Sequence, residues 1–567
     1  MADSEESGRN QFGAVVSAQD MQDTYLPAFR AGIEQGNASG LMCSYNAETY
    51  GSGLFGSGTQ GGAIPSCANK GLLTDTARGA WGFRGYVTGD CEAAVGVMKD
   101  HHYTTNALDT VVAVLGAGMD SDCGQFLNTS LMAAAYGNAS IAAHADAALV
   151  RLYAVKMRLG FFDPRSSVPW ALVRGEVVDT PAHRQLAKEA ADQGLVLLQN
   201  TDNTLPLAAA HVKRVAVIGR NANSTTNMLG DYFGTPSSIV SPLAGIAAHA
   251  AASFATGLDI AAAVDIVKDV DAVVLVVGLM SAGAPKGEHA DEGEGNDRHS
   301  LLLPGTQHAL VGNVSAAAAA AGKPVVVVAL SGGAIDLSAE KANTAVGAIL
   351  WAGYPGQSGG AAIADALFGV TSPSGRLTVT WYPEKYTTQV ELKNMAMRPN
   401  SSGYPGRTHR FYTGPTVFPF GAGLTFLNVS VQPPQVELKS RPALRAALLA
   451  TGSGGRGAPI EIGQAVVRLH NFGHRAGRVT VVLFAAPVLL GSGATGADAG
   501  TPASSVVGFD SVWLAAGEAR SHRIPIPVDR LRFADRNGRL VSRAGQWIFW
   551  VGTAADSERG VPVEVAF

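Results

Sequence analysis

The chain has 567 residues, a formal net charge of -4 and 16% charged residues. That length exceeds what a single hydrophobic core supports, so we expect about three structural units. The low charge and the abundant Gly and Ala exclude a disordered or coiled-coil protein, and because no Lys/Arg run could neutralise a phosphate backbone, we expect no nucleic-acid partner.

The beginning of the chain and its cysteines and sequons point to different compartments. MADSEESGRN lacks the basic and apolar regions of a signal peptide, and no apolar run reaches the roughly 18 residues of a membrane span. Four cysteines form two local pairs, Cys43 with Cys67 and Cys91 with Cys123, which disulfides could close; four free buried thiols are the alternative. Seven N-x-[ST] sequons begin at Asn37, Asn128, Asn138, Asn223, Asn313, Asn400 and Asn428. We therefore expect a secreted protein with no membrane partner, whose true N-terminus precedes Met1.

Residues 1 to about 163 alternate short apolar runs with helical patterns, which is typical of βα units and a parallel sheet. We predict strands at 41–46, at 85–90 and in the run ending at 124, and helices near 19–35, 70–82, 104–116 and 140–159. Each predicted strand finishes in polar residues. The carboxyl ends of strands are where α/β barrels and open sheets place their chemistry, but three strands cannot close a barrel of eight.

A polar, Pro-containing segment from 164 to about 180 predicts a linker, and a second α/β unit follows with a helix that starts near Pro181. Continuous apolar runs at 212–219, 272–278, 323–331 and 346–353 predict buried strands in a sheet that is covered on both faces. The alanine run at 316–322 predicts the end of a helix before a glycine cap.

From about residue 430 apolar and polar residues alternate between Gly-rich breaks, as in AVVRLHNFG and QWIFWVG. This pattern predicts a β-sandwich. The Gly-rich stretch at 491–505 predicts a mobile loop. The expected fold class is therefore α/β followed by all-β.

Asp90 is the first candidate for chemistry. It ends the predicted strand in GYVTGDCEAA, where a rigid support can aim a carboxylate into a cleft. Position alone is weak evidence, because Asp is also favoured as the N-cap of a helix, here one beginning at Cys91. The two interpretations stay open at this point.

An acidic loop after the strand at 272–278 provides the second set of candidates. It combines two basic residues with five carboxylates: Lys286, Arg298, Glu288, Asp291, Glu292, Glu294 and Asp297. Such a loop is usually only solvated, and its spacing misses the calcium-binding EF-hand pattern. Glycoside hydrolysis needs two carboxyl groups in different roles, which can come from different units facing one cleft. Asp90 and a loop Glu would meet that requirement.

A nucleotide site in the second unit is excluded by spacing. VAVIGRNAN is a strand followed by Gly, but it has no G-x-G-x-x-G and no acidic residue at the end of a following strand. A dinucleotide would therefore lack its phosphate-binding turn.

A series of motifs runs in order along nearly the whole chain: LMCSYN, GYVTGDCEAAVGV, HHYT, GMDSDCG, RLGFFDP, GLVLLQN, EGEGNDR, LLLPG, ILWAGYPGQSGGAAIADALFG, SGRLTVTWYP and HRFYTGPTVFPFGAGLTF. The series resembles glycoside hydrolase family 3, in its β-xylosidase and α-L-arabinofuranosidase branch. The resemblance implies a retaining exo-glycosidase that releases xylose from the non-reducing end of xylo-oligosaccharides or xylan. We expect no cofactor and no metal ion.

The resemblance also assigns roles to the two carboxylates. Asp90 attacks the anomeric carbon to form a glycosyl-enzyme, which water then hydrolyses. Glu294, just before Gly-x-Asp-Arg, matches the family's acid/base, and Glu292 is the rival. Tyr45 and Asn46 match positions that line the sugar pocket, although a buried Tyr with a hydrogen-bonded hydroxyl is the alternative.

Further implications of the resemblance concern the pocket floor. A disulfide between Cys91 and Cys123 would leave little space for the exocyclic CH2OH that glucose has and xylose lacks, so a pentose is favoured. His101, His102 and Tyr103 match a family motif, but paired His residues without other ligands are more often structural. Gly89 departs from the family, which usually has Ser there, and this could loosen how Asp90 is held.

The resemblance gives the expected units and their bounds. They are the C-terminal part of a (β/α)8 barrel (1–163), a linker (164–180), an α/β sandwich domain with the acid/base loop (181–385), a connecting segment (386–429) and a fibronectin type III-like β-sandwich (430–567). About five barrel strands would precede residue 1, so we expect this polypeptide, made alone, to fold poorly in its first 160 residues and to have little activity. A non-catalytic carbohydrate-binding or scaffold remnant is the alternative function. The choice between xylosidase, arabinofuranosidase and dual activity stays open, as does the oligomeric state.

Overall fold

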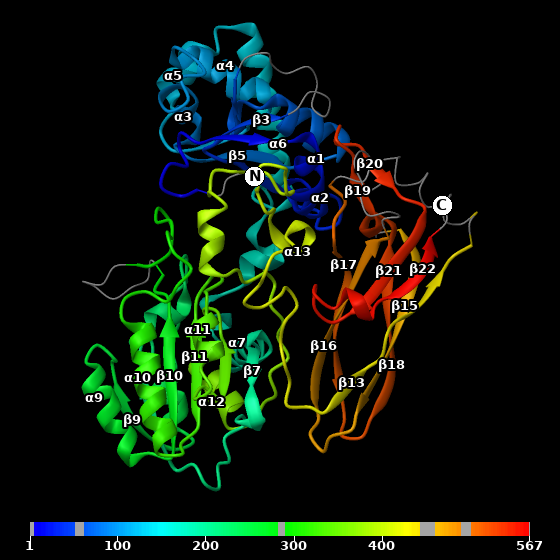
Figure 1. Cartoon of the computed structure of the whole chain (residues 1–567). Helices are drawn as coiled ribbons and strands as arrows, with labels where there is room; N and C mark the ends of the chain where they lie inside the picture. Colours follow the sequence, from blue (N-terminus) through cyan, green and yellow to red (C-terminus); the bar gives the residue numbers. More distant parts are fainter. Residues whose placement is uncertain are drawn as a thin grey trace.

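The computed structural model describes residues 5–50, 62–281, 290–440, 442, 460–488 and 500–565. Three bodies are joined by a long connecting segment (Figure 1). The N-terminal body lies above the second body, which is an α/β unit. The C-terminal β body lies along the side of both.

Three parallel strands form the centre of the N-terminal unit, in the order β2-β5-β6. They are β2 (Gly40–Cys43), β5 (Tyr86–Cys91) and β6 (Ser121–Cys123). The helical segments around them are α1 (Ala18–Asp20), η1 (Met21–Tyr25), α2 (Pro27–Glu34), η2 (Ser66–Ala68), η3 (Gly71–Ala80), α3 (Ala93–Lys99), α4 (Ala107–Ala117), α5 (Thr129–Ala135) and α6 (Ala139–Arg158). Buried Val87, Val111, Val114 and Met119 pack strands against helices, so the predicted βα pattern is confirmed.

A second small sheet in this unit is absent from the prediction. It contains β1 (Gly13–Val16), β3 (Ala47–Tyr50) and β4 (Ile64–Pro65). Because β1 pairs in parallel with β3, the chain near the N-terminus lies directly beside the segment that follows β2. That pairing places the residues just before β1 next to the ends of the central strands.

The second body is a six-stranded sheet in the order β7-β12-β11-β10-β8-β9, in which only the β7–β12 pair is antiparallel. Its strands are β7 (Val196–Asn200), β8 (Arg214–Ile218), β9 (Ala251–Ala255), β10 (Ala272–Gly278), β11 (Val325–Leu330) and β12 (Ala348–Trp351). Its helices are α7 (Pro181–Gly194), α8 (Pro242–Ala247), α9 (Ile260–Asp265), α10 (Gln307–Ala320), α11 (Ser338–Ala342) and α12 (Gly359–Leu367).

Both faces of this sheet are covered, as the apolar runs predicted. Alternate residues of β10 enter two different cores: Val273 and Leu275 pack with α10, whereas Val274 and Val276 pack with α12. The alanine run ends α10 at Ala320, and the following Gly322 has a φ of 65°. This left-handed conformation favours Gly and confirms the predicted cap.

Three short 3-10 helices occupy the predicted linker: η4 (Arg165–Ser167), η5 (Pro169–Leu172) and η6 (Gly175–Val177). The connecting segment carries η10 (Glu384–Thr388) and α13 (Thr408–Phe411). The bounds expected for the units from the sequence stay predictions.

The third body is a sandwich of two antiparallel sheets, β13-β15-β14 with β18 beside β15, and β17-β16-β21-β22. The strands are β13 (Val429–Val431), β14 (Gln435–Leu438), β15 (Glu461–Asn471), β16 (Gly477–Pro487), β17 (Ser505–Leu514), β18 (Ala519–Pro527), β21 (Gly545–Val551) and β22 (Val561–Val565), with the small pair β19 (Arg532–Ala534) and β20 (Leu540–Ser542). Ala465, Val467, Leu483 and Phe549 fill the space between the sheets. The predicted sandwich is confirmed, whereas the predicted mobile loop lies largely outside the described residues, which exclude 489–499.

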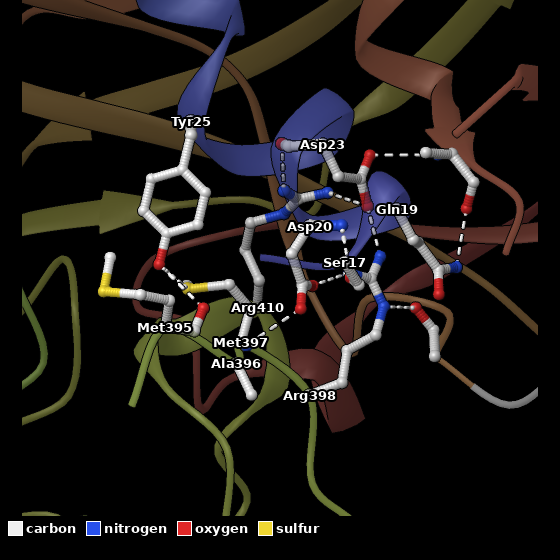
Figure 2. Close-up of polar contacts among 12 residues, drawn as sticks. Ser17, Gln19, Asp20, Asp23, Tyr25, Met395, Ala396, Met397, Arg398 and Arg410 are labelled. Carbon is white, nitrogen blue, oxygen red and sulfur yellow. Dashed lines mark hydrogen bonds and ion pairs between the residues drawn. The ribbon is translucent and has the colours of Figure 1, made fainter. Parts of the chain in front are cut away.

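A buried ion network joins the N-terminal unit to the connecting segment and to the sandwich (Figure 2). Asp20 and Asp23 both accept hydrogen bonds from Arg398, and the Asp23 carboxylate also lies 3.4 Å from Arg410. The Asp23 carboxylate accepts a further hydrogen bond of 3.0 Å from the backbone of Ala534, in the sandwich. Only 3% of the Asp23 side chain is exposed, so its charge depends on these partners.

We expect Asp23→Asn to lower the free energy of unfolding by about 3–5 kcal/mol, because it leaves two buried guanidinium groups without their shared carboxylate. Chemical denaturation followed by circular dichroism measures this. Asp75→Asn is the matched control, since Asp75 pairs with Lys70 on an exposed surface, and it should cost no more than about 1 kcal/mol. Equal effects of the two substitutions would contradict the role given to the network.

His409 provides a pH-dependent test of the same joint. Burial, followed by the nearby charge of Arg410, lowers the pKa of His409 from 6.5 to about 4. The folded protein therefore resists protonation of His409, so stability present above pH 6.5 should be lost as the pH falls toward 4. We expect His409→Gln to reduce the loss of thermal stability between these pH values, measured by melting curves at several pH values. An unchanged slope would show that His409 is not the group responsible.

Candidate active site

Asp90 lies in β5, one residue before the end of the strand, and is half-buried. Its Oδ1 accepts a hydrogen bond of 2.7 Å from the backbone of Cys91. The following helix, α3, begins at Ala93, and its N-cap is Glu92. The helix-cap interpretation of Asp90 is therefore wrong, and the strand end aims this carboxylate at the edge where the chemistry was expected.

Both predicted disulfides are present, and the alternative of four free thiols is wrong. Cys91–Cys123 joins the ends of β5 and β6, and Cys43–Cys67 joins the end of β2 to η2. A Cβ placed on Gly89 would lie 3.4 Å from the Met119 sulfur, which is an ordinary contact. A Cβ at this position therefore meets no steric conflict.

Tyr45 reaches Asp90 from the neighbouring strand end. Burial, and then the hydrogen bond between the Tyr45 hydroxyl and the Asp90 carboxylate, raise the pKa of Tyr45. The hydroxyl therefore stays protonated and can donate to Asp90. His101 Nε2 lies 2.8 Å from the Tyr45 carbonyl oxygen, which fixes the backbone at this point and agrees with a structural role for the histidine.

Asn46 is placed differently from its neighbour. It is fully buried, and its side chain hydrogen-bonds with the Ser44 hydroxyl at 2.6 Å and with the Ala47 carbonyl at 3.5 Å. The structure thus brings Tyr45 to the Asp90 carboxylate, whereas the described side-chain bonds of Asn46 go to Ser44 and Ala47. The prediction that Asn46 touches the sugar stays untested.

The acidic loop divides into carboxylates with different partners. Glu292 Oε1 accepts hydrogen bonds from the Gly332 backbone at 2.7 Å and from the Tyr354 hydroxyl at 2.6 Å. The Asp291 carboxylate accepts from Arg220 and from the Met280 backbone. The described hydrogen bonds of these two carboxylates therefore stay within the α/β unit. Lys286 and Glu288 lie outside the described residues.

Glu294 faces the N-terminal unit instead. Its side chain is 40% exposed, and its Oε1 accepts a hydrogen bond of 2.7 Å from Arg9. The Arg9 guanidinium also lies over the Tyr45 ring, 4.9 Å from its centroid. The negative charge of Glu294 contributes to the raised pKa of Tyr45. Asp90, Tyr45, Arg9 and Glu294 therefore form one continuous cluster, contributed by two units of the chain.

The sequence analysis missed one member of this cluster, Arg9, and one neighbour of it, Tyr232. Arg9 stands in a polar stretch without a motif, and Tyr232, whose hydroxyl donates to Glu294, follows no predicted element. The β1–β3 pairing that brings Arg9 close to Tyr45 was the missing signal.

Comparisons with known proteins match this arrangement. A profile of the glycosyl hydrolase family 3 C-terminal domain matches residues 195–426, and one of the fibronectin type III-like domain matches residues 490–555. Beta-D-xylosidase 3 of Arabidopsis thaliana is 36% identical over 97% of this chain and 70% of its own length. The chain belongs to glycoside hydrolase family 3.

Other family 3 relatives extend the comparison. A beta-xylosidase/alpha-L-arabinofuranosidase 2 from Medicago sativa subsp. varia is 42% identical over 76% of this chain, which spans 54% of that relative. A solved exo-beta-xylosidase in complex with a xylobiose aziridine probe is 28% identical, with a TM-score of 0.85 over 99% of this chain and 70% of its own. The expected fold class is confirmed by these matches.

Within the described ranges no group of three or more His, Cys, Asp or Glu side chains could hold a metal ion. In the same part of the chain, no helix is long and apolar enough to cross a membrane.

The different surroundings of Glu292 and Glu294 give a stability test. We expect Glu292→Ala to lower the free energy of unfolding by about 1–3 kcal/mol, because it leaves the Tyr354 hydroxyl and the Gly332 N–H without their acceptor. Glu294→Ala should cost no more than about 1 kcal/mol, because its ion pair is exposed. Denaturation curves of the two variants compare these values directly. The reverse order would make Glu294 the structural carboxylate.

Proposed function

We propose that this family 3 chain is a retaining exo-glycosidase that releases xylose from the non-reducing end of xylo-oligosaccharides, with Asp90 as nucleophile and Glu294 as acid/base. One observation carries the proposal: carboxylates from two units lie in a single cluster, linked through the Tyr45 hydroxyl and the Arg9 guanidinium. Two carboxyl groups on opposite sides of a glycosidic bond are what retaining hydrolysis needs.

The proposed chemistry has two steps. In the first, an Asp90 oxygen bonds to the anomeric carbon while the glycosidic bond breaks, and Glu294 gives its proton to the departing oxygen. In the second, the ionised Glu294 takes a proton from water, whose oxygen displaces Asp90 and leaves the sugar with its original anomeric configuration. The Tyr45 hydroxyl, donating to Asp90, orients the attacking carboxylate.

Glu294 is preferred to Glu292 because of their partners. Glu292 already accepts two short hydrogen bonds inside its own unit and lies 3.9 Å from Arg298. A group that must exchange protons with a substrate needs an approach from solvent, which the 40% exposure of the Glu294 side chain provides. The arrangement therefore supports Glu294 as the acid/base that gives up and takes back the proton.

The pentose preference rests on the disulfide between Cys91 and Cys123, which follows Asp90 directly in the chain. At the floor of a sugar pocket this bond would leave little space for an exocyclic CH2OH. The names of the relatives support xylose as the released sugar, and the Medicago relative's name adds arabinofuranose. The two disulfides also favour secretion, since such bonds persist in oxidising compartments. Secretion is therefore part of the proposal.

Turnover of nitrophenyl β-xyloside, α-L-arabinofuranoside and β-glucoside tests this function. We expect xyloside to be hydrolysed best and glucoside least, and Asp90→Asn to remove turnover of all three. Glu294→Gln should lower kcat/KM for xylobiose by about 10²–10⁴-fold, because the leaving sugar then lacks its proton donor. Wild-type rates in Asp90→Asn would overturn the assignment, and binding without any turnover by the unaltered protein would favour a carbohydrate-binding remnant.

A further inference from the structure

We propose that Arg9 is a positioning residue that holds the acid/base loop, and Glu294 in particular, over the Tyr45–Asp90 pair. The proposal rests on the function proposed above, and assigns a role to the segment Glu5–Arg9, which precedes the small sheet of the N-terminal unit. This segment and the loop at Gly293–Asp297 belong to different bodies, so contacts between them set how the two halves of the site meet.

Contacts with the segment Glu5–Arg9 fasten the loop directly after Glu294. After it, the Asp297 carboxylate accepts hydrogen bonds from the backbone N–H groups of Glu6, at 3.0 and 3.1 Å, and of Ser7, at 2.8 Å. The Gly295 N–H donates in return to the Glu6 carboxylate at 3.1 Å. Burial alone would raise the pKa of Asp297, but the hydrogen bonds from the Ser7 and Glu6 backbone outweigh it and lower that pKa. The loop is therefore bound next to Glu294, rather than only at its ends.

Arg9 supplies the contact with Glu294 itself. One end of its guanidinium donates to Glu294 Oε1 at 2.7 Å, the other donates to Glu6 at 2.9 Å, and the planar group lies over the Tyr45 ring. The hydrogen bond to Glu294 is the largest cause of the raised pKa of Arg9. A planar fork can satisfy two carboxylates and an aromatic face at once, which a lysine ammonium cannot.

Without Arg9, the partners of Glu294 among the described residues would all come from its own unit. These are the Tyr232 hydroxyl, itself on an 83% exposed residue, and a long backbone contact of 3.3 Å to the Asp231 carboxylate. Neither of them touches Tyr45 or Asp90 among the described interactions. Arg9 is the described side chain that contacts both Glu294 and Tyr45, so it fixes the distance across the interface.

The chemical consequence follows from what a guanidinium can do. Arg9 only donates hydrogen bonds, so it supports the negative charge that Glu294 acquires as its proton passes to the leaving oxygen. Its loss should therefore slow bond cleavage when the leaving group needs that proton. Cleavage of an aryl group that departs as a stable anion should be nearly unaffected. A merely structural role would slow both substrates alike.

Arg9→Gln and Arg9→Lys, measured on xylobiose and on 2,4-dinitrophenyl β-xyloside, test the inference. We expect Arg9→Gln to lower kcat/KM for xylobiose by about 10–100-fold, which is the effect of displacing a reacting group by about 1 Å. The kcat/KM for the activated xyloside should change by less than about threefold. Arg9→Lys should recover part of the xylobiose rate. Arg30→Gln is the matched control, because it removes a guanidinium paired with Glu34 away from the site and should alter neither substrate.

Glu294→Gln separates failure of this inference from failure of the proposed function. If Glu294→Gln lowers kcat/KM equally for xylobiose and for the activated xyloside, the acid/base assignment itself is wrong. If Glu294→Gln shows the difference between substrates and Arg9→Gln does not, the positioning role is overturned. Hydrogen exchange of residues 290–298 provides a second measurement that needs no turnover: exchange should accelerate in Arg9→Gln and not in Arg30→Gln, and unchanged exchange would also contradict the role of Arg9.

Discussion

The relative placement of two bodies with separate hydrophobic cores is the constraint on which the whole site depends. Asp90 is fixed to the end of β5, and Glu294 is carried by a loop of the α/β unit, so neither unit holds a complete pair. The buried network of Asp20, Asp23, Arg398 and Arg410 fastens the N-terminal unit to the connecting segment and the sandwich. Because unpaired buried charges are costly, this joint tolerates little change in the arrangement of the bodies.

The fold was largely predictable because its signals are local. Continuous apolar runs gave β8, β10, β11 and β12, and alternation gave the sandwich. The small sheet of β1, β3 and β4 was not found, since its strands are short and pair across distant parts of the chain. Likewise β7 and β9, at the two edges of the central sheet, were missed. Their amphipathic or short patterns are hard to distinguish from turns.

The candidate site was predictable only in part. The position of Asp90 at the end of a predicted strand marked it as a candidate, and the spacing of the cysteines predicted their pairing. The choice between Asp90 as a helix cap and as a reactive group needed the position of α3. Glu292 and Glu294 differ by two positions in one loop, and only their hydrogen-bond partners separate them. Arg9 has no motif at all, because its role comes from tertiary pairing that brings it over Tyr45.

Trapping the glycosyl-enzyme tests the central claim most directly. A 2-deoxy-2-fluoro xylosyl fluoride should react with the proposed nucleophile, because the fluorine slows hydrolysis of the covalent intermediate more than its formation. We predict that mass spectrometry of the digested protein places one fluorosugar on the peptide containing Asp90, and that Asp90→Asn prevents the labelling. A sugar attached to another carboxylate, with Asp90 unmodified, would contradict the account.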